Sequence, residues 1–218
     1  MIWRILPHAT ACSASDKLLL LDLRQDRYFA VPEALAGAML EWLERRYACA
    51  PPPEIRALLG RARITRDGDP DPTNALKERV TFPTALERPS GADARIIGRL
   101  ALSALIAGTW TKLRTRSLHG ILESRAARSE LPVRGHHDEI SAIAASYDER
   151  RSSTPISRNC LLDSLALDAL LARHGFGAKL VFGVCATPFG AHCWLQTSEM
   201  VLNDSYDHVA RFTPIFAQ

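Results

Sequence analysis

The chain has 218 residues, of which 47% are hydrophobic and 23% charged, a balance typical of a folded globular protein. The formal net charge of +3 is too small to indicate nucleic-acid binding. The five cysteines are widely spaced without a Cys-x-x-Cys pair, which argues against a disulfide framework or a zinc ribbon. We predict no secretion signal and no membrane span, and therefore expect a cytoplasmic protein.

The first 66 residues are predicted to form one small domain. An apolar run at 18–23 and an aromatic, β-branched run at 27–31 flank a polar turn, which predicts a hairpin. Pro32 then opens a helix of regular apolar spacing, and a second helix follows a run of three prolines. This order is typical of a small winged-helix-like domain. The acidic, Gly- and Pro-containing start of residues 67–89 predicts a linker.

Residues 90–218 are predicted to form a second, larger domain with a helical part and an antiparallel sheet. Helices are expected over 94–122 (one or two), 138–150 and 157–174, and strands over 178–185, 192–197 and 200–203. The whole chain is therefore expected to have an α+β fold.

Cys160 is the first residue that points to chemistry. It lies in the first turn of a predicted helix, where free backbone N–H groups and the helix dipole favour a thiolate. The backbone N–H of Cys160 is the natural first donor of an oxyanion hole. Asn159 and Arg158 are candidates for the second donor, and the sequence does not choose between them.

His192 and Asp204 follow Cys160 on the predicted strands. If Thr197 pairs with Met200 across the turn, His192 pairs with Ser205, and Asp204 is one residue out of register. A one-residue offset places two side chains on opposite faces of a sheet. Contact between His192 and Asp204 therefore requires a bulge, or a strand that ends before Asp204.

The order Cys160, His192, Asp204 resembles papain-like and transglutaminase-like cysteine enzymes, in which a thiolate, an imidazole and a carboxylate share the work. The local sequence motifs are more specific than this order of residues. Four stretches closely resemble the lasso-peptide maturation B proteins, which are leader peptidases: Cys160-Leu-Leu-Asp-Ser-Leu-Ala-Leu167, Leu180-Val-Phe-Gly-Val184, Pro188-Phe-Gly-Ala-His-Cys-Trp-Leu195 and Val201-Leu-Asn-Asp204. This resemblance covers roughly residues 155–216 and implies a transglutaminase-like (papain-like) peptidase domain with Cys160, His192 and Asp204 as its catalytic residues.

The same resemblance implies partners. The N-terminal domain would bind the leader of a precursor peptide as an added strand along Arg27, Tyr28, Phe29, Ala30 and Val31. A separate cyclase related to asparagine synthetase would then use ATP to close the lasso ring. The chain itself is expected to need no metal and no organic cofactor.

Two other functions stay open. A transglutaminase-like thiol could transfer an acyl group to an amine, or the protein could be a carrier that escorts the precursor to the cyclase. DNA binding through the winged-helix-like half is disfavoured by the weak charge.

Several neighbours of the candidate residues receive structural interpretations. Cys185 and Cys193 are expected to pack in the sheet region. Asp163 and Ser164 are expected on the helix surface, with substrate contact as the second interpretation. His208 is a candidate for a supporting role near the carboxylate.

Overall fold

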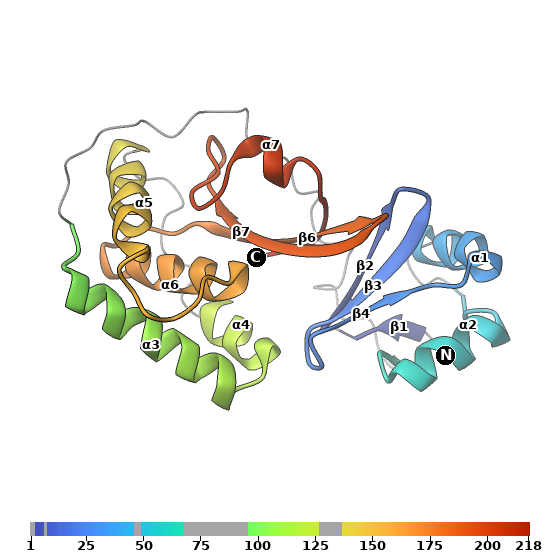
Figure 1. Cartoon of the computed structure of the whole chain (residues 1–218). Helices are drawn as coiled ribbons and strands as arrows, with labels where there is room; N and C mark the ends of the chain where they lie inside the picture. The colour runs from blue at the N-terminus through green and yellow to red at the C-terminus, as the bar shows by residue number, and fades with distance from the viewer. Residues whose placement is uncertain (1–2, 7, 46–48, 68–95, 127–136) are drawn as a thin grey trace.

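The computed structural model describes residues 3–6, 8–45, 49–67, 96–126 and 137–218. The fold is mixed α/β with antiparallel sheets, and its elements form an N-terminal half (residues 3–67) and a C-terminal half (residues 96–218) (Figure 1). Of the predicted linker, Asp67 ends a strand, and the rest of that segment lies outside the described residues.

The N-terminal half contains the predicted hairpin. Its elements are β1 (Trp3–Ile5), β2 (Ala9–Ala14), β3 (Lys17–Asp22), β4 (Arg27–Ala30), α1 (Glu33–Glu44), α2 (Pro53–Ala62) and β5 (Thr65–Asp67). The antiparallel pairing of β3 with β4 confirms the hairpin, and α1 begins directly after Pro32 as predicted. The sequence pattern missed β2, which makes β3 the central strand of a β2-β3-β4 sheet, and it missed the β1–β5 pair. The winged-helix assignment stays a prediction.

The C-terminal half combines helices with a second antiparallel sheet of order β7-β6-β8. Its elements are α3 (Arg99–Thr115), α4 (Leu118–Ala126), α5 (His137–Arg151), α6 (Cys160–Arg173), β6 (Lys179–Ala186), β7 (Phe189–Gln196), α7 (Tyr206–Val209) and β8 (Thr213–Ala217). The predicted helices and the first two predicted strands are present with shifted ends. Among the described residues, no helix has the length and apolar character needed to cross a membrane.

The predicted third strand over 200–203 is wrong. Only Val201 bridges to Gln196 there, and the strand that completes the sheet is β8, which pairs with the other edge of β6. Pairing beyond this bridge stops because the side-chain amide of Asn203 accepts the N–H of Leu195 (2.8 Å) in place of a backbone carbonyl. Strand β8 then pairs with β6 in place of the predicted third strand.

The largest apolar core contains residues of both halves. Leu19 and Leu21 on one face of β3 belong to the large cluster that contains the core of α6, β6 and β7, whereas Leu18 and Leu20 on the other face pack with α1 and α2. All four leucines are at most 2% exposed. A hydrogen bond crosses the same interface: Thr10 donates to the Ile215 carbonyl at 2.7 Å. The N-terminal sheet is therefore covered on both faces.

Candidate active site

Cys160 is the first residue of α6, as its predicted position at the head of a helix requires. Asn159 caps this helix, because its side-chain oxygen accepts the N–H groups of Leu161 and Leu162, each at 3.1 Å. Such a cap fixes the direction in which the first turn points. The cap engages the Asn159 side-chain oxygen, and the Asn159 backbone N–H donates to Asp163 Oδ2 at 3.2 Å. The other candidate, Arg158, is engaged in an ion pair with Asp148 at 3.0 Å.

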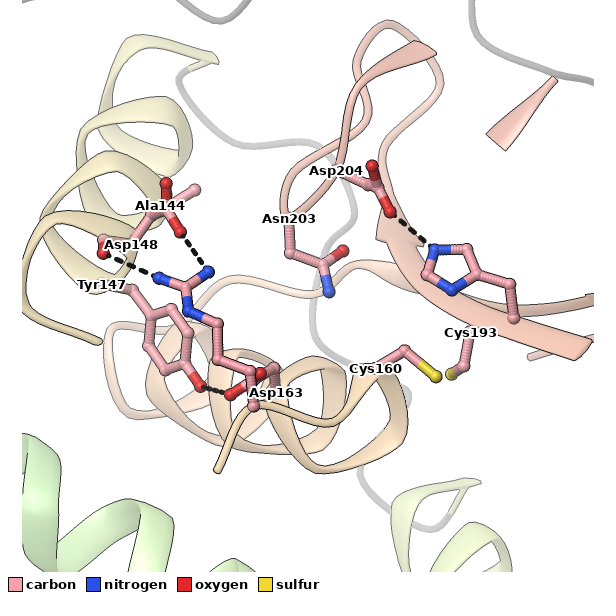
Figure 2. A pocket seen from close by; sticks show the side chains of 10 residues that line it. Ala144, Tyr147, Asp148, Cys160, Asp163, Cys193, Asn203 and Asp204 are labelled. Atoms are coloured by element: carbon pink, nitrogen blue, oxygen red, sulfur yellow. Dashed lines mark hydrogen bonds and ion pairs between the residues drawn. The ribbon is translucent and has the colours of Figure 1, made fainter. Parts of the chain in front are cut away.

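A buried arginine holds the segment that leads into α6. Arg151, only 1% exposed, donates to the carbonyl groups of Ile156 (2.8 Å) and Ser157 (3.1 Å) and forms an ion pair with Asp163. Tyr147 donates to the same carboxylate at 3.0 Å (Figure 2). Asp163 is therefore not a solvated helix-surface residue, as the sequence suggested, but the anchor that binds α5 to the start of α6.

Ser164 also departs from its predicted surface role. It is fully buried, donates to the Cys193 carbonyl on β7 at 3.1 Å and accepts from the Asn203 amide at 2.8 Å. One hydroxyl thus joins α6, β7 and the loop that carries Asp204. This bond fixes the distance between the helix with Cys160 and the strand with His192.

His192 and Asp204 are in direct contact. The His192 Nε2–H donates to Asp204 Oδ2 at 2.6 Å. Gln196 pairs with Val201 as the register arithmetic requires, but the strand ends before Asp204, so the offset does not separate the two side chains. This is the second of the two solutions that the sequence left open. Since Nε2 is taken by Asp204, the hydrogen bond between His192 and Cys160 uses Nδ1.

Aromatic side chains enclose the His192 ring. Trp194 lies nearly parallel to it with centroids 5.9 Å apart, and Phe212 lies 5.1 Å away. Trp194 is fully buried, so it both fills the core and covers the imidazole. Gly183 makes room for this arrangement, because a Cβ there would lie 2.7 Å from Trp194 and 2.8 Å from Phe212.

His208 forms a second bond to the carboxylate. Its Nδ1–H donates to Asp204 Oδ2 at 2.9 Å, the same oxygen that binds His192, and the Ser205 N–H donates to Oδ1 at 2.7 Å. His192, Asp204 and His208 each offer an atom within 4.8 Å of the others, a spacing that could hold a metal ion. A cation there would displace the hydrogen bonds that orient His192.

The charges of the three central groups support one another. Burial alone would raise the pKa of Cys160, but the hydrogen bond and charge of His192, with two backbone N–H groups, hold it below its ordinary value. Burial would lower the pKa of His192, yet hydrogen bonds to Asp204 and Cys160 raise it to about 9. Burial would raise the pKa of Asp204, and its two histidine partners lower it to about 2. These shifts favour a thiolate–imidazolium pair beside an ionised carboxylate.

An open cavity of about 120 Å³ adjoins these groups. Cys160, His192 and Asp204 line it together with Tyr147 and Asp148 of α5. Figure 2 shows Cys160 and Asp204 on one side and Tyr147 and Asp148 on the other. A peptide carbonyl placed in this cavity would meet the sulfur at the positive end of α6. The arrangement can therefore support nucleophilic attack by a thiolate on an acyl group.

The predicted leader-binding residues lie on and just after β4. Arg27 and Ala30 are exposed, Phe29 packs toward the α1–α2 cluster, and Val31 is buried. Tyr28 points the other way and meets Phe189 at the β6–β7 hairpin, with ring centroids 5.8 Å apart. The strand therefore lies between the helices of its own half and the sheet that carries His192.

Some contributors to the site carry no local signal in the sequence. Arg151, Phe212 and Gly183 act through contacts with residues 12, 20 and 11 positions away, respectively, and no spacing rule identifies them. In contrast, His208 was identified as a neighbour of the carboxylate from its position near Asp204. Long-range packing alone reveals the first group.

A thiol at the head of a helix, an imidazole on an antiparallel sheet and a carboxylate on the following loop, joined in series, are typical of thiol-dependent enzymes. The family model of the transglutaminase-like superfamily matches residues 105–217, which is more than half of the chain. The chain therefore belongs to the transglutaminase-like superfamily, whose members typically have cysteine-dependent enzyme activity. No curated protein and no solved structure matches the chain.

Proposed function

We propose that the protein is a cysteine peptidase that removes the leader of a lasso-peptide precursor, with Cys160 as nucleophile, His192 as acid–base group and Asp204 as orienting carboxylate. The observation that carries the chemistry is the hydrogen-bonded series from the Cys160 sulfur through the His192 ring to Asp204. The quoted motifs from Cys160 to Asp204 support the choice of substrate, because they resemble those of the lasso-peptide maturation B proteins.

The chemistry follows from the resting charges. The Cys160 thiolate attacks the carbonyl carbon of the scissile bond, and the backbone N–H of Cys160 stabilises the oxyanion. The His192 imidazolium gives its Nδ1 proton to the leaving amine, which departs as the free N-terminus of the core peptide. The neutral ring then takes a proton from water, and the hydroxide releases the leader from the sulfur as a carboxylic acid. Asp204 holds the ring on its Nε2 side throughout.

The leader is proposed to bind along β4. Within the described residues, β4 pairs only with β3, so the backbone groups of its other edge can accept an added strand. The segment is Arg27 to Val31, and its backbone would supply affinity while neighbouring pockets select the sequence. Tyr28 links this strand to the hairpin of the catalytic sheet through Phe189. A bound leader would thus lead its C-terminal end toward the sheet with His192.

The freed core would pass to a partner. In this proposal an ATP-using cyclase related to asparagine synthetase joins the new amine to a side-chain carboxylate, and the peptidase itself uses no metal or organic cofactor. The work is divided because hydrolysis of a peptide bond needs only thiol chemistry, whereas amide formation in water needs an activated acid.

The decisive experiment compares Cys160→Ala with wild type on a lasso-peptide precursor. Loss of the sulfur is expected to slow leader removal by at least ~1,000-fold while leader affinity is unchanged. Cleavage is followed by mass spectrometry and affinity by fluorescence anisotropy of a labelled leader. Cys185→Ala is the matched control, because Cys185 is also half-buried and its thiol donates to the Thr187 carbonyl at 3.8 Å.

Normal cleavage by Cys160→Ala would overturn the proposal and favour the carrier function. Intact precursor in both proteins, with leader bound, would also favour a carrier.

Membership of the transglutaminase-like superfamily supports a second candidate, acyl transfer. The acyl-enzyme on Cys160 is the same, but an amine replaces water as its acceptor. Adding a primary amine to the cleavage reaction separates the two functions, because a transferase gives a leader heavier by the amine. A leader acid at all amine concentrations supports the peptidase.

A further inference from the structure

The thiol of Cys193 is the nucleophilic group closest to the site that the proposed chemistry does not use. Cys193 follows His192 on β7, so its side chain enters the opposite face of the strand. It is only 2% exposed, and the Cys193 carbonyl accepts the hydroxyl of Ser164, one helical turn after Cys160 on α6. The second sulfur therefore lies in the layer between α6 and β7, directly behind the nucleophile.

The two cysteines are in contact. The backbone N–H of Cys193 donates to the Cys160 sulfur, and the charge of Cys160 acts on the Cys193 thiol. Figure 2 shows the two sulfur atoms turned toward one another. A thiolate that accepts the N–H of a residue lies within a side chain's reach of that residue's own sulfur. We propose that Cys160 and Cys193 form a reversible disulfide that protects the nucleophile from irreversible oxidation.

The reaction needs a hydroperoxide as oxidant. The Cys160 thiolate attacks the terminal oxygen, the O–O bond breaks, and the alkoxide leaves as an alcohol with the His192 proton, which gives a sulfenic acid. The Cys193 sulfur then attacks the Cys160 sulfur, the S–O bond breaks, and water leaves with the thiol proton. Two thiols are thus oxidised and one hydroperoxide is reduced to an alcohol and water. A dithiol reverses the disulfide by exchange.

The chemical environments of the two sulfurs suit these roles. The lowered pKa of Cys160 makes it the thiolate that meets the oxidant, and burial raises the pKa of Cys193, which keeps it a protonated thiol until the sulfenic acid forms. The other cysteines lie elsewhere: Cys12 is on β2, Cys49 is exposed after α1, and the Cys185 thiol donates to the Thr187 carbonyl at 3.8 Å.

The test uses the full-length protein and does not depend on any substrate. Wild type is treated with a small excess of tert-butyl hydroperoxide, digested without reductant and mapped by mass spectrometry. We expect a 160–193 cross-link and a fall from five free thiols to three. Dithiothreitol is expected to restore the reaction of Cys160 with iodoacetamide to its initial rate.

Cys193→Ala and Cys193→Ser remove the second thiol. In both variants hydroperoxide is expected to drive Cys160 to sulfinic acid, so that dithiothreitol restores little of its reaction with iodoacetamide. Cys185→Ala is the control and should behave as wild type.

Irreversible oxidation of wild type to the same extent as Cys193→Ala, or a cross-link between other cysteines, would overturn the inference. The wild-type map decides the question even if the Cys193 variants fold poorly. Since iodoacetamide needs only the thiolate, failure of the peptidase proposal leaves this result unaffected.

Discussion

Strands β3 and β7 are buried in different ways. The difference distinguishes the strand that joins the two halves of the molecule from the strand that carries a residue of the candidate active site. From Leu18 to Leu21, β3 is buried on both faces, with alternate side chains in two clusters. In contrast, β7 begins with the 57% exposed Phe189, is half-buried at His192, and becomes fully buried only from Cys193. A strand covered on both faces joins two layers, whereas a strand open along half its length leaves space for a reactive group.

The contrast explains why the site lies where it does. The covered end of β7 is fixed by Trp194 and by the bond between Ser164 and the Cys193 carbonyl. The open end lets the His192 ring meet both a thiol and a carboxylate. Rigid support on one side and open space on the other is the arrangement that a preorganised nucleophile requires.

The largest effect is expected from breaking the doubly covered strand. Leu21→Asp places an unpaired charge at a position with no exposure, so we expect a loss of more than ~4 kcal/mol of stability. Because Leu21 packs in the core that contains α6 and β6, the C-terminal half should lose its structure in the same transition.

Thermal unfolding followed by circular dichroism measures this, together with the iodoacetamide reactivity of Cys160 at pH 6. Leu100→Asp is the control, because Leu100 is 88% exposed on α3. A variant whose N-terminal half unfolds while Cys160 keeps its reactivity would show that the halves do not depend on one core.

The sequence identified much of both halves but not their connection. The run of four leucines predicted a strand, and a continuous apolar run is also what burial on both faces produces. The helix that begins at Cys160 and the positions of His192 and Asp204 were readable because each depends on local spacing. The second partners of β6 and β3 were not, since β8 and β2 have weak patterns and their pairing is decided by packing across the chain.

The His192–Asp204 contact shows the limit of register arithmetic. After the turn at 198–199, Gln196 pairs with Val201 in the expected register. The Asn203 side chain then accepts the Leu195 N–H, and the strand pairing ends before Asp204. Strand propensity in the sequence does not reveal that one side-chain amide will take the place of a backbone carbonyl as hydrogen-bond acceptor.

An intermediate effect is expected from Asp204→Asn, which acts on the open end of β7. The carboxylate helps to raise the pKa of His192 to about 9. Its loss should therefore move to lower pH the upper inflection of the alkylation profile, which is the rate of Cys160 alkylation plotted against pH. The lower inflection should move up, because a ring that is less often protonated stabilises the thiolate less. Cleavage should slow by about 10²- to 10⁴-fold without stopping, since Asp204 orients the ring and takes no part in bond making.

Iodoacetamide rates between pH 5 and pH 10 measure both inflections. Asp207→Asn is the matched control, a neighbouring carboxylate on α7 that shares neither histidine contact of Asp204. An unchanged profile in Asp204→Asn would mean that the contact between His192 and Asp204 does not set the charge of the pair.

The smallest effect is expected from His208, which supports the carboxylate from outside. His208→Ala removes the 2.9 Å bond to Asp204 Oδ2 but leaves the bonds from His192 and the Ser205 N–H. A partly exposed hydrogen bond to a charged group contributes about 1 kcal/mol, so cleavage should slow roughly fivefold with no change in leader affinity. A positioning role also predicts that the pKa of Asp204 rises, because one of the bonds that lower it is lost. The carboxyl titration of Asp204, followed by NMR, should then shift to higher pH, and His208→Gln, which keeps an N–H donor, should restore part of the original value. If His208→Ala and His208→Gln both leave the titration of Asp204 unchanged, His208 only fills space beside Phe212, and the bonds from His192 and the Ser205 N–H alone fix Asp204.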